Sequence, residues 1–209
     1  MPAAYSGCYG MKPTHGLVPY TGIMPIESTL DHAGPMTQNV ADNALMLEVI
    51  AGADGLDPRQ YNVVTDTYTR AVTAGASGLK IGVVKEGFGH ASSESDVDQK
   101  VRAAANILSE CGASVDEISV PWHLKGLPIW TPIASEGATN QMMHGNGMGT
   151  GWEGMYTTSL LDYHANWRGR ADELSDTLKI TMFVGQYFLK HHRGHYLSLI
   201  HISEPTRPR

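Results

Sequence analysis

The chain has 209 residues, of which 42% are apolar and 17% charged, and its formal net charge at pH 7 is −6. This balance is typical of a globular domain rather than a disordered chain. The negative charge argues against nucleic acid or an anionic membrane surface as a partner, because both attract basic faces. The sequence has no apolar run long enough to span a bilayer and no signal-peptide pattern at its start, so we expect a cytoplasmic protein.

Residues 1–35 are rich in glycine and proline, which break helices and favour turns, so this stretch is predicted to form loops and short strands. Such a long irregular stretch needs a scaffold on both sides, and we therefore expect further sequence before it. The first predicted helix begins after an N-cap at Thr37 and stops at Gly52. Its apolar face consists of Val40, Ala44, Leu47 and Ala51.

Apolar runs at residues 79–84 and 115–120 predict two strands. The helix between them is predicted to begin at a Ser95–Asp98 capping pair and to end at Gly112. Strand, helix and strand in this order form a βαβ unit with parallel strands, which places the fold in the α/β class. The apolar face of this helix consists of Val97, Val101, Ala104, Leu108 and Cys111.

Residues 127–143 and 159–190 are predicted to be mainly helical. Ser135 and Glu136 are predicted to lie on a helix surface, and contact with a substrate near Trp130 is the alternative. The glycine-rich residues 145–154 between the two helical stretches are predicted to form a flexible loop. They do not fit a phosphate cradle, because no strand precedes them and no Lys-Ser or Lys-Thr pair follows.

Neither the histidines nor the cysteines predict a metal site. His191 and His195 lie one helical turn apart, but no carboxylate or cysteine nearby completes a ligand set, so we predict a packed or solvated helix. Cys8 and Cys111 stand in unrelated contexts and give no disulfide framework. Both are predicted to be small buried side chains in a reducing compartment.

Several short strings in the first part of the chain together resemble the amidase-signature family, in the segment directly after its glycine- and serine-rich signature. They are Pro2-Ala3, Gly7-Cys8-Tyr9-Gly10, Lys12-Pro13-Thr14-His15-Gly16, Leu30-Asp31-His32-Ala33-Gly34-Pro35-Met36 and Ala51-Gly52-Ala53-Asp54. In that family an arginine, one variable residue and then Pro-Ala follow the nucleophilic serine. The resemblance implies that this serine precedes Met1, and that the chain is an internal fragment that lacks the catalytic signature.

Three later strings resemble the subgroup that includes enantioselective and nitrile-pathway amidases. They are Asp57-Pro58-Arg59-Gln60, Glu86-Gly87-Phe88-Gly89-His90 and Pro121-Trp122-His123. The resemblance covers residues 1–196 and implies a partial amidase-signature domain, an α/β fold with a mixed central sheet covered by helices, here incomplete.

The family resemblance implies an amide hydrolase that converts small carboxamides to carboxylic acid and ammonia without a cofactor. A lysine acts as base, one serine relays the proton and a second serine attacks the carbonyl, since a free hydroxyl needs an adjacent base. None of these three residues is expected in the chain, so it is expected to be inactive as given. Lys12 matches a structural lysine of the family and not the base. The resemblance leaves open whether the full-length protein is a homodimer.

The resemblance also implies a substrate pocket. Leu30 and Trp130 match positions that line the acyl side of the pocket in similar enzymes, which would favour aliphatic or aromatic amides. Ordinary core positions are the alternative for both. Asp31 is expected to pair with a family arginine upstream, or else to be a solvated surface residue.

Two other functions stay open. One is the amidotransferase branch of the family, which passes ammonia to a glutamyl-tRNA through partner subunits. In that branch the stretch before the aspartate consists of small residues and serines, whereas residues 25–32 here read PIESTLDH, which favours a free-standing amidase. The other is a non-catalytic α/β binding or scaffold protein.

Residues 197–209 are expected to lie outside the natural domain. The string from Leu197 to Arg207, LSLIHISEPTR, resembles the conceptual translation of a transposase adapter used in sequencing libraries. A natural amphipathic tail is the alternative. If residues 197–209 are translated adapter sequence, they do not belong to the natural fold.

Overall fold

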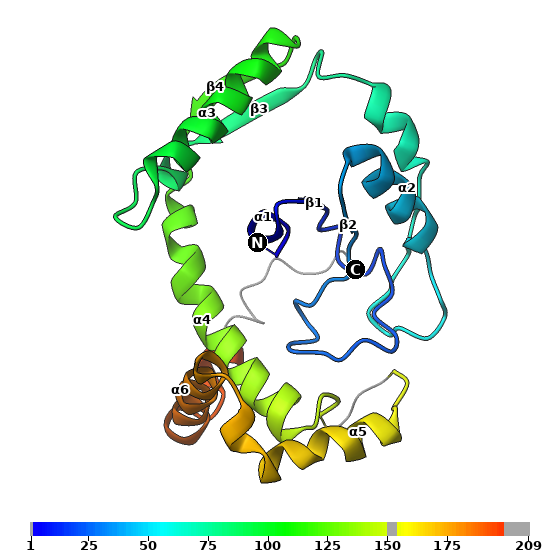
Figure 1. Cartoon of the computed structure of the whole chain (residues 1–209), viewed down its shortest axis with the longest axis vertical. Helices are drawn as coiled ribbons and strands as arrows, with labels where there is room; N and C mark the ends of the chain where they lie inside the picture. The colour runs from blue at the N-terminus through cyan, green and yellow to red at the C-terminus, as the bar shows by residue number, and fades with distance from the viewer. Residues whose placement is uncertain (1, 150–153, 199–209) are drawn as a thin grey trace. The chain divides into compact units, whose positions relative to one another are not determined.

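The computed structural model describes residues 2–149 and 154–198. The chain divides into two compact units, one that combines Met1–Tyr68 with Ile129–Arg209 and a second of Thr69–Pro128. Figure 1 shows their helices and strands. Across the described part of the chain, no helix has both the length and the apolar character needed to cross a membrane.

The N-terminal part of the first unit is mostly loop, as predicted, but it opens with a short helix that the sequence did not indicate. The elements are α1 (Pro2–Ser6), β1 (Tyr9–Gly10), β2 (Met36–Thr37) and α2 (Val40–Ile50). β1 and β2 pair antiparallel, with Tyr9 opposite Thr37. The pair brings the two ends of a loop of more than twenty residues together, and this loop carries Tyr20 and Asp31 of the candidate site.

Helix α2 is confirmed, but its predicted N-cap is wrong. Asn39 is the cap, and its side-chain oxygen accepts a hydrogen bond of 2.8 Å from the backbone N–H of Asp42. Thr37 instead ends β2 and donates to the carbonyl of Asn39. Asn and Thr are both good caps, so strand pairing decides between them. The buried residues of α2 are Asn43 and Leu47. Of these two, only Leu47 belongs to the predicted apolar face.

The second unit contains the predicted βαβ arrangement. Its elements are η1 (Tyr68–Thr73), β3 (Lys80–Val84), η2 (Lys85–Gly87), α3 (Ser95–Glu110), β4 (Ser114–Ile118) and η3 (Pro121–Lys125). β3 and β4 are parallel, with Ile81 opposite Val115. This confirms the parallel pair with a helical connection.

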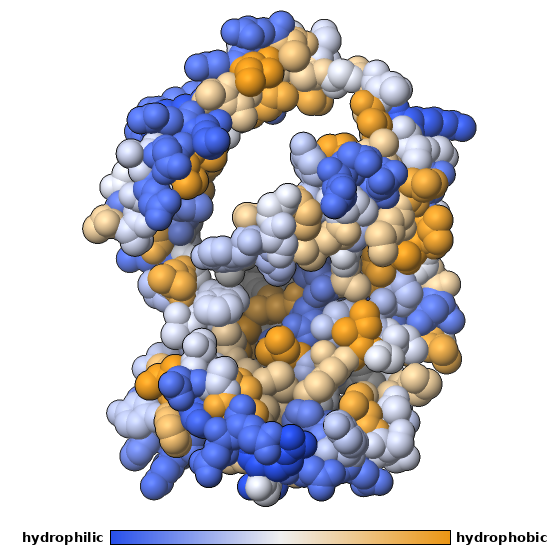
Figure 2. All heavy atoms as spheres, viewed as in Figure 1, coloured by the Kyte–Doolittle hydropathy of each residue, from blue (hydrophilic) through white to orange (hydrophobic). Residues whose placement is uncertain are grey.

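Two details of α3 differ from the prediction. Ser95 is the first helical residue and not the cap, while Asp98 accepts hydrogen bonds from the Ser93 hydroxyl at 2.7 Å and from Gly89 N–H at 3.0 Å. No residue of α3 is buried, and Cys111, at its C-terminal end, is exposed rather than buried as predicted. Cys8 is half-buried. Figure 2 shows apolar patches beside the charged side chains over β3 and α3 at the top of the view.

The C-terminal part of the chain is helical, as predicted. It contains α4 (Gly126–Gly137), the π-helical segment η4 (Ala138–His144), α5 (Thr158–Ala165), η5 (Asn166–Gly169), η6 (Ala171–Glu173) and α6 (Asp176–His192). α6 packs against η4. The intervening glycine-rich segment has left-handed backbone at Asn146, Gly147 and Gly149, and its residues 150–153 lie outside the described part.

The core of the first unit lies where α4 and η4 meet α6. Gly185 allows the close approach, because a Cβ there would lie 2.1 Å from the carbonyl oxygen of Ser135 and 2.2 Å from the Thr139 hydroxyl. Ser135 and Glu136 are buried here, which corrects the prediction that they lie on a helix surface. They are buried because Gly185 lets α6 approach closely, and the sequence pattern of α4 alone does not reveal this contact.

Candidate functional site

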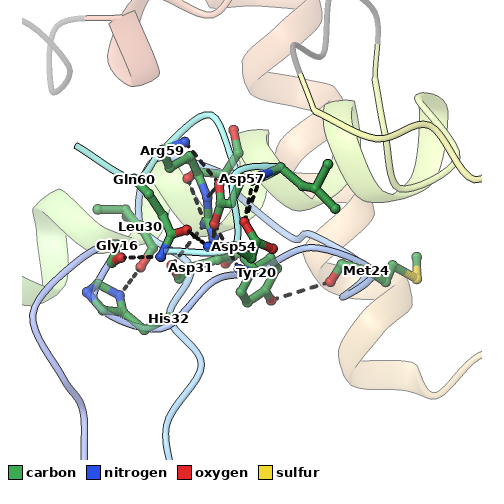
Figure 3. Close-up of polar contacts among 12 residues, drawn as sticks. Gly16, Tyr20, Met24, Leu30, Asp31, His32, Asp54, Asp57, Arg59 and Gln60 are labelled. Carbon is green, nitrogen blue, oxygen red and sulfur yellow. Dashed lines mark hydrogen bonds and ion pairs between the residues drawn. The ribbon is translucent and has the colours of Figure 1, made fainter. Parts of the chain in front are cut away.

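A buried ion pair forms the centre of the candidate site (Figure 3). The Arg59 guanidinium donates from Nε to Asp57 Oδ1 at 3.0 Å and from Nη2 to Oδ2 at 2.8 Å. The two side chains are only 6% and 1% exposed. This two-point geometry between a planar guanidinium and a carboxylate is the strongest form of the pair, and burial protects it from solvent screening.

The local sequence positions this pair. Asp54 accepts the backbone N–H groups of Leu56 and Asp57 at 2.8 and 2.9 Å, which closes the turn that leads into the pair. Asp57 Oδ1 also accepts the backbone N–H of Arg59, and its Oδ2 accepts that of Tyr20 at 2.8 Å. The guanidinium carbon lies 4.4 Å from the centre of the Tyr20 ring, a cation–π distance. The four hydrogen bonds to its oxygens fix Asp57 as a carboxylate.

Arg59 connects this turn to the segment around Asp31. Its Nη1 donates to the carbonyl oxygens of Ser28 and Asp31, each at 3.2 Å. The Asp31 carboxylate accepts the backbone N–H groups of Ile26 and Glu27 at 2.7 and 3.1 Å. Asp31 is therefore half-buried and closes a turn, so the solvated-surface alternative is wrong. Its pairing with an upstream arginine stays a prediction.

Gln60 connects the same cluster to the first loop. Its Nε2 donates to the carbonyls of Gly16 at 2.9 Å and Gly52 at 2.7 Å, and its Oε1 accepts Asp54 N–H at 3.0 Å. Figure 3 shows Gln60 beside Gly16, with His32 bonded to the carbonyl of Leu30. Segments separated by more than forty residues are thus held by one amide side chain.

Burial and hydrogen bonding set the pKa values of the cluster. Burial alone would raise the pKa of Asp57, but the hydrogen bonds from the Arg59 side chain and from backbone N–H groups outweigh it and lower the pKa to about 2. Burial and the nearby Asp31 carboxylate raise the pKa of Tyr20 to about 12. Burial also raises the pKa of Asp31 and lowers that of His32.

A small pocket lies beside the ion pair. Its lining residues are Tyr20, Thr21, Gly22, Ile23, Leu56, Asp57, Pro58, Met148, Gly154 and Met155. The polar atoms of the Asp57–Arg59 pair are bonded to one another and to backbone. This arrangement can hold loops rigidly against a ligand, and the pair offers no proton acceptor that titrates near neutral pH.

The two predicted substrate residues lie in the first unit. Leu30 is half-buried and directly precedes Asp31, so the cluster fixes its backbone. Trp130 lies on α4 and is 53% exposed. The substrate role of both residues stays a prediction.

A second buried carboxyl group lies outside this cluster. Glu136 is 0% exposed, its Oε2 accepts the backbone N–H of Leu197 at 3.2 Å, and its Oε1 has no hydrogen-bond partner among the described residues. Burial raises its pKa. Within the described residues, no group of three or more His, Cys, Asp or Glu could hold a metal ion.

The sequence interpretation missed the roles of Tyr20 and Glu136, and it used Asp57 and Arg59 only as part of a family string. Opposite charges on either side of a proline are a usable signal, because a turn at Pro58 brings the two side chains together. No local signal identifies Glu136, whose burial depends on α6.

Comparison with known proteins identifies relatives of the chain. The family model described as Amidase matches residues 1–205. An enantioselective amidase of Rhodococcus rhodochrous is 42% identical over 199 residues, which are 94% of this chain and 38% of that protein. A glutamyl-tRNA(Gln) amidotransferase subunit of Lysinibacillus sphaericus (strain C3-41) is 37% identical over 90% of this chain and 38% of its own length. The chain thus spans well under half the length of these relatives.

Solved structures show the same fold. A glutamyl-tRNA(Gln) amidotransferase subunit of Thermotoga maritima superposes with a TM-score of 0.63 and 20% sequence identity. The match covers 93% of this chain and 36% of that one. The predicted α/β fold, as part of an amidase-signature architecture, is therefore confirmed.

Proposed function

This chain belongs to the Amidase family, and we propose that it forms one portion of an amide hydrolase that converts small carboxamides to carboxylic acid and ammonia. The catalytic lysine and two serines lie, in this proposal, in sequence that precedes the matched segment. One observation carries the proposal. The strings that resemble the family around Gly16, Asp31 and Asp57–Gln60 are far apart in the chain, yet they form one hydrogen-bonded cluster.

The cluster has a defined role in this proposal. The Asp57–Arg59 pair and Gln60 hold the loops that follow the nucleophile in family members, so that the acyl side of the substrate meets a rigid wall. Leu30 and Trp130 form the apolar part of this wall and select aliphatic or aromatic amides. The half-buried position of Leu30 beside Asp31 and the exposed ring of Trp130 support this assignment.

The test compares the chain with a chimera. Residues 2–196 replace the matching segment of the Rhodococcus rhodochrous enantioselective amidase, and ammonia release from simple aliphatic and aromatic amides is measured. We expect no turnover from the 209-residue chain and measurable turnover from the chimera. Hydrolysis by purified chain alone would place a complete catalytic set within it. A chimera that is folded by circular dichroism but inactive would contradict the proposal.

The amidotransferase branch is the second candidate, because the amidotransferase subunit of Lysinibacillus sphaericus is 37% identical. Residues 25–32 favour the free-standing amidase. The same chimera distinguishes the two, since an amidotransferase-type pocket would release ammonia from glutamine and discriminate against aromatic amides. We expect the reverse preference.

The tail from Leu197 onward is, in our proposal, not part of the amidase domain and contributes nothing to its function. The support is the string LSLIHISEPTR, which resembles translated adapter sequence. A long read of the source DNA across this point tests it. Native sequence in place of residues 197–209 is the expected result, and the same residues in unamplified genomic DNA would refute it.

A further inference from the structure

The turn that carries Leu30 is closed by its own residues. The backbone N–H groups of Leu30 and Asp31 donate to the carbonyl of Glu27 at 3.0 and 2.9 Å. The Glu27 carboxylate accepts the backbone N–H and the hydroxyl of Thr29 at 3.1 and 2.7 Å, and Glu27 is only 7% exposed. Arg59 bonds to carbonyl oxygens of this turn. A partner for its remaining N–H groups comes from another part of the chain.

That partner is the π-helical segment η4, together with the end of α4. Gln141 Oε1 accepts the backbone N–H of Ser28 at 3.0 Å. Gly137 lies against Glu27, because a Cβ on this glycine would be 2.7 Å from Glu27 Oε2 and 3.0 Å from Glu27 Cβ. Both contacts lie within the first unit and join segments far apart in the chain.

The glycine-rich segment after η4 holds Gln141 in place. The N–H of Gly145 donates to the carbonyl of Asn140 at 2.9 Å, and that of Gly147 donates to the carbonyl of Gln141 at 3.0 Å. A Cβ on Gly145 would lie 2.9 Å from the same carbonyl oxygen, so a larger residue would displace it. π-Helical segments are rare and occur frequently at functional sites. Here the segment carries the side chain that bonds to Ser28.

We propose that Gln141 and Gly137 are positioning residues for substrate selection, because they fix residues 27–29 and thereby the place of Leu30. This inference rests on the proposed function, in which Leu30 forms part of the apolar wall. Neither residue touches the substrate in this role. The wall residue is then held by two elements, the turn of Arg59 and η4. Aromatic amides extend farther along such a wall than acetamide does, so they depend more on its position.

Amide hydrogen exchange tests the contact without any need for turnover. The exchange of the Ser28 N–H is measured by NMR in the 209-residue chain and by mass spectrometry in the chimera. Gln141→Met removes the accepting oxygen at a similar side-chain volume, and we expect this exchange to become about 5- to 10-fold faster. Gln99→Met, on the exposed Gln99 of α3, is the matched control and should leave it unchanged. Equal Ser28 exchange in wild type and Gln141→Met would overturn the proposal.

The kinetics of the chimera test the effect on selection. We expect Gln141→Met to raise KM for aromatic amides by about 10-fold, with a smaller change for acetamide and little change in kcat, since substrate binding is weakened and the chemistry is not. Gln141→Glu keeps an accepting oxygen and should retain most of the selectivity. Gly137→Ala should act in the same direction as Gln141→Met by displacing Glu27, whereas Gly126→Ala, with open space around it, should have no effect.

The outcomes separate this inference from the proposed function. A folded but inactive chimera would overturn the proposed function and the substrate role of the turn together. An active chimera in which Gln141→Met changes KM equally for both amides, or lowers kcat alone, would overturn the positioning role only. If circular dichroism shows that Gln141→Met is unfolded, the comparison of Gly137→Ala with Gly126→Ala decides the same question.

Discussion

The buried ion pair permits the sharpest test of how the first unit is held together. In Asp57→Asn one carboxylate oxygen becomes an NH2 group. Oδ1 of Asp57 accepts from the backbone N–H and Nε of Arg59, and Oδ2 accepts from Arg59 Nη2 and Tyr20 N–H. The amide NH2 would therefore face two donors whichever way it is oriented, and the Arg59 guanidinium would lose its counter-ion.

The expected loss of unfolding free energy is about 3–5 kcal/mol, the usual cost of leaving one buried charge unpaired. The lowered pKa of Asp57 implies a smaller loss. The folded pKa of Asp57 is about 2 against an ordinary 3.8, and this difference corresponds to about 2 kcal/mol. Because the folded pKa is lowered, this stability is present above pH 3.8 and is lost as the pH falls towards 2.

Urea unfolding followed by circular dichroism at pH 7 measures the loss. Two controls isolate the pair. Glu173→Gln removes an ion pair with Arg170 whose side chains are 60% and 63% exposed, and it should cost less than about 1 kcal/mol. The double variant Asp57→Asn with Arg59→Met removes the unpaired charge and should recover part of the stability. A loss under about 1 kcal/mol for Asp57→Asn alone would refute the central role of the pair.

Three further predictions concern other residues. Gly185→Ala should destabilise the chain by about 1–3 kcal/mol in urea, because its Cβ would meet α4 backbone at 2.1 Å, whereas Gly169→Ala, with open space around it, should have little effect. Burial raises the pKa of Glu136, so this group should lower the stability as the pH rises above 4.5, by at most about 1.4 kcal/mol per pH unit, and Glu136→Gln should make the slope of stability against pH less negative. In the active chimera, Trp130→Ala should raise KM for aromatic amides by about 10-fold with a smaller change for acetamide, and equal changes for both would contradict a substrate role.

Local patterns predicted the regular elements well. The βαβ unit followed from two apolar runs and one helical repeat, since each of these signals lies within a few turns of chain. The α1 helix was missed because its five residues are too few to show a period, and they lie in a stretch dominated by glycine and proline. The cap of α2 was misplaced because Thr37 takes part in strand pairing with a segment far earlier in the chain.

The candidate site was only partly predictable for a different reason. Asp31, Asp57 and Gln60 were noticed as family strings, but their contacts run between segments that share no local pattern. An aspartate is usually exposed unless it is paired, and the local pattern does not reveal a partner that lies far away in the chain. Arg59 decides this case, because one guanidinium bonds to two carbonyls of a distant turn and to the Asp57 carboxylate.

Whether a side chain is buried in this protein thus depends on which two elements pack together, and not on the sequence pattern of one element. Glu136 is buried although it carries a carboxyl group, because Gly185 brings α6 close, while Val97 of α3 is exposed although the apolar period is correct. Trp130 of α4 is 53% exposed, and either a substrate or another protein segment can cover it. A substrate and a protein segment would cover it with different consequences. Only the substrate would make the effect of Trp130→Ala depend on which amide is offered, which is why that variant is assayed against two amides and not by stability alone.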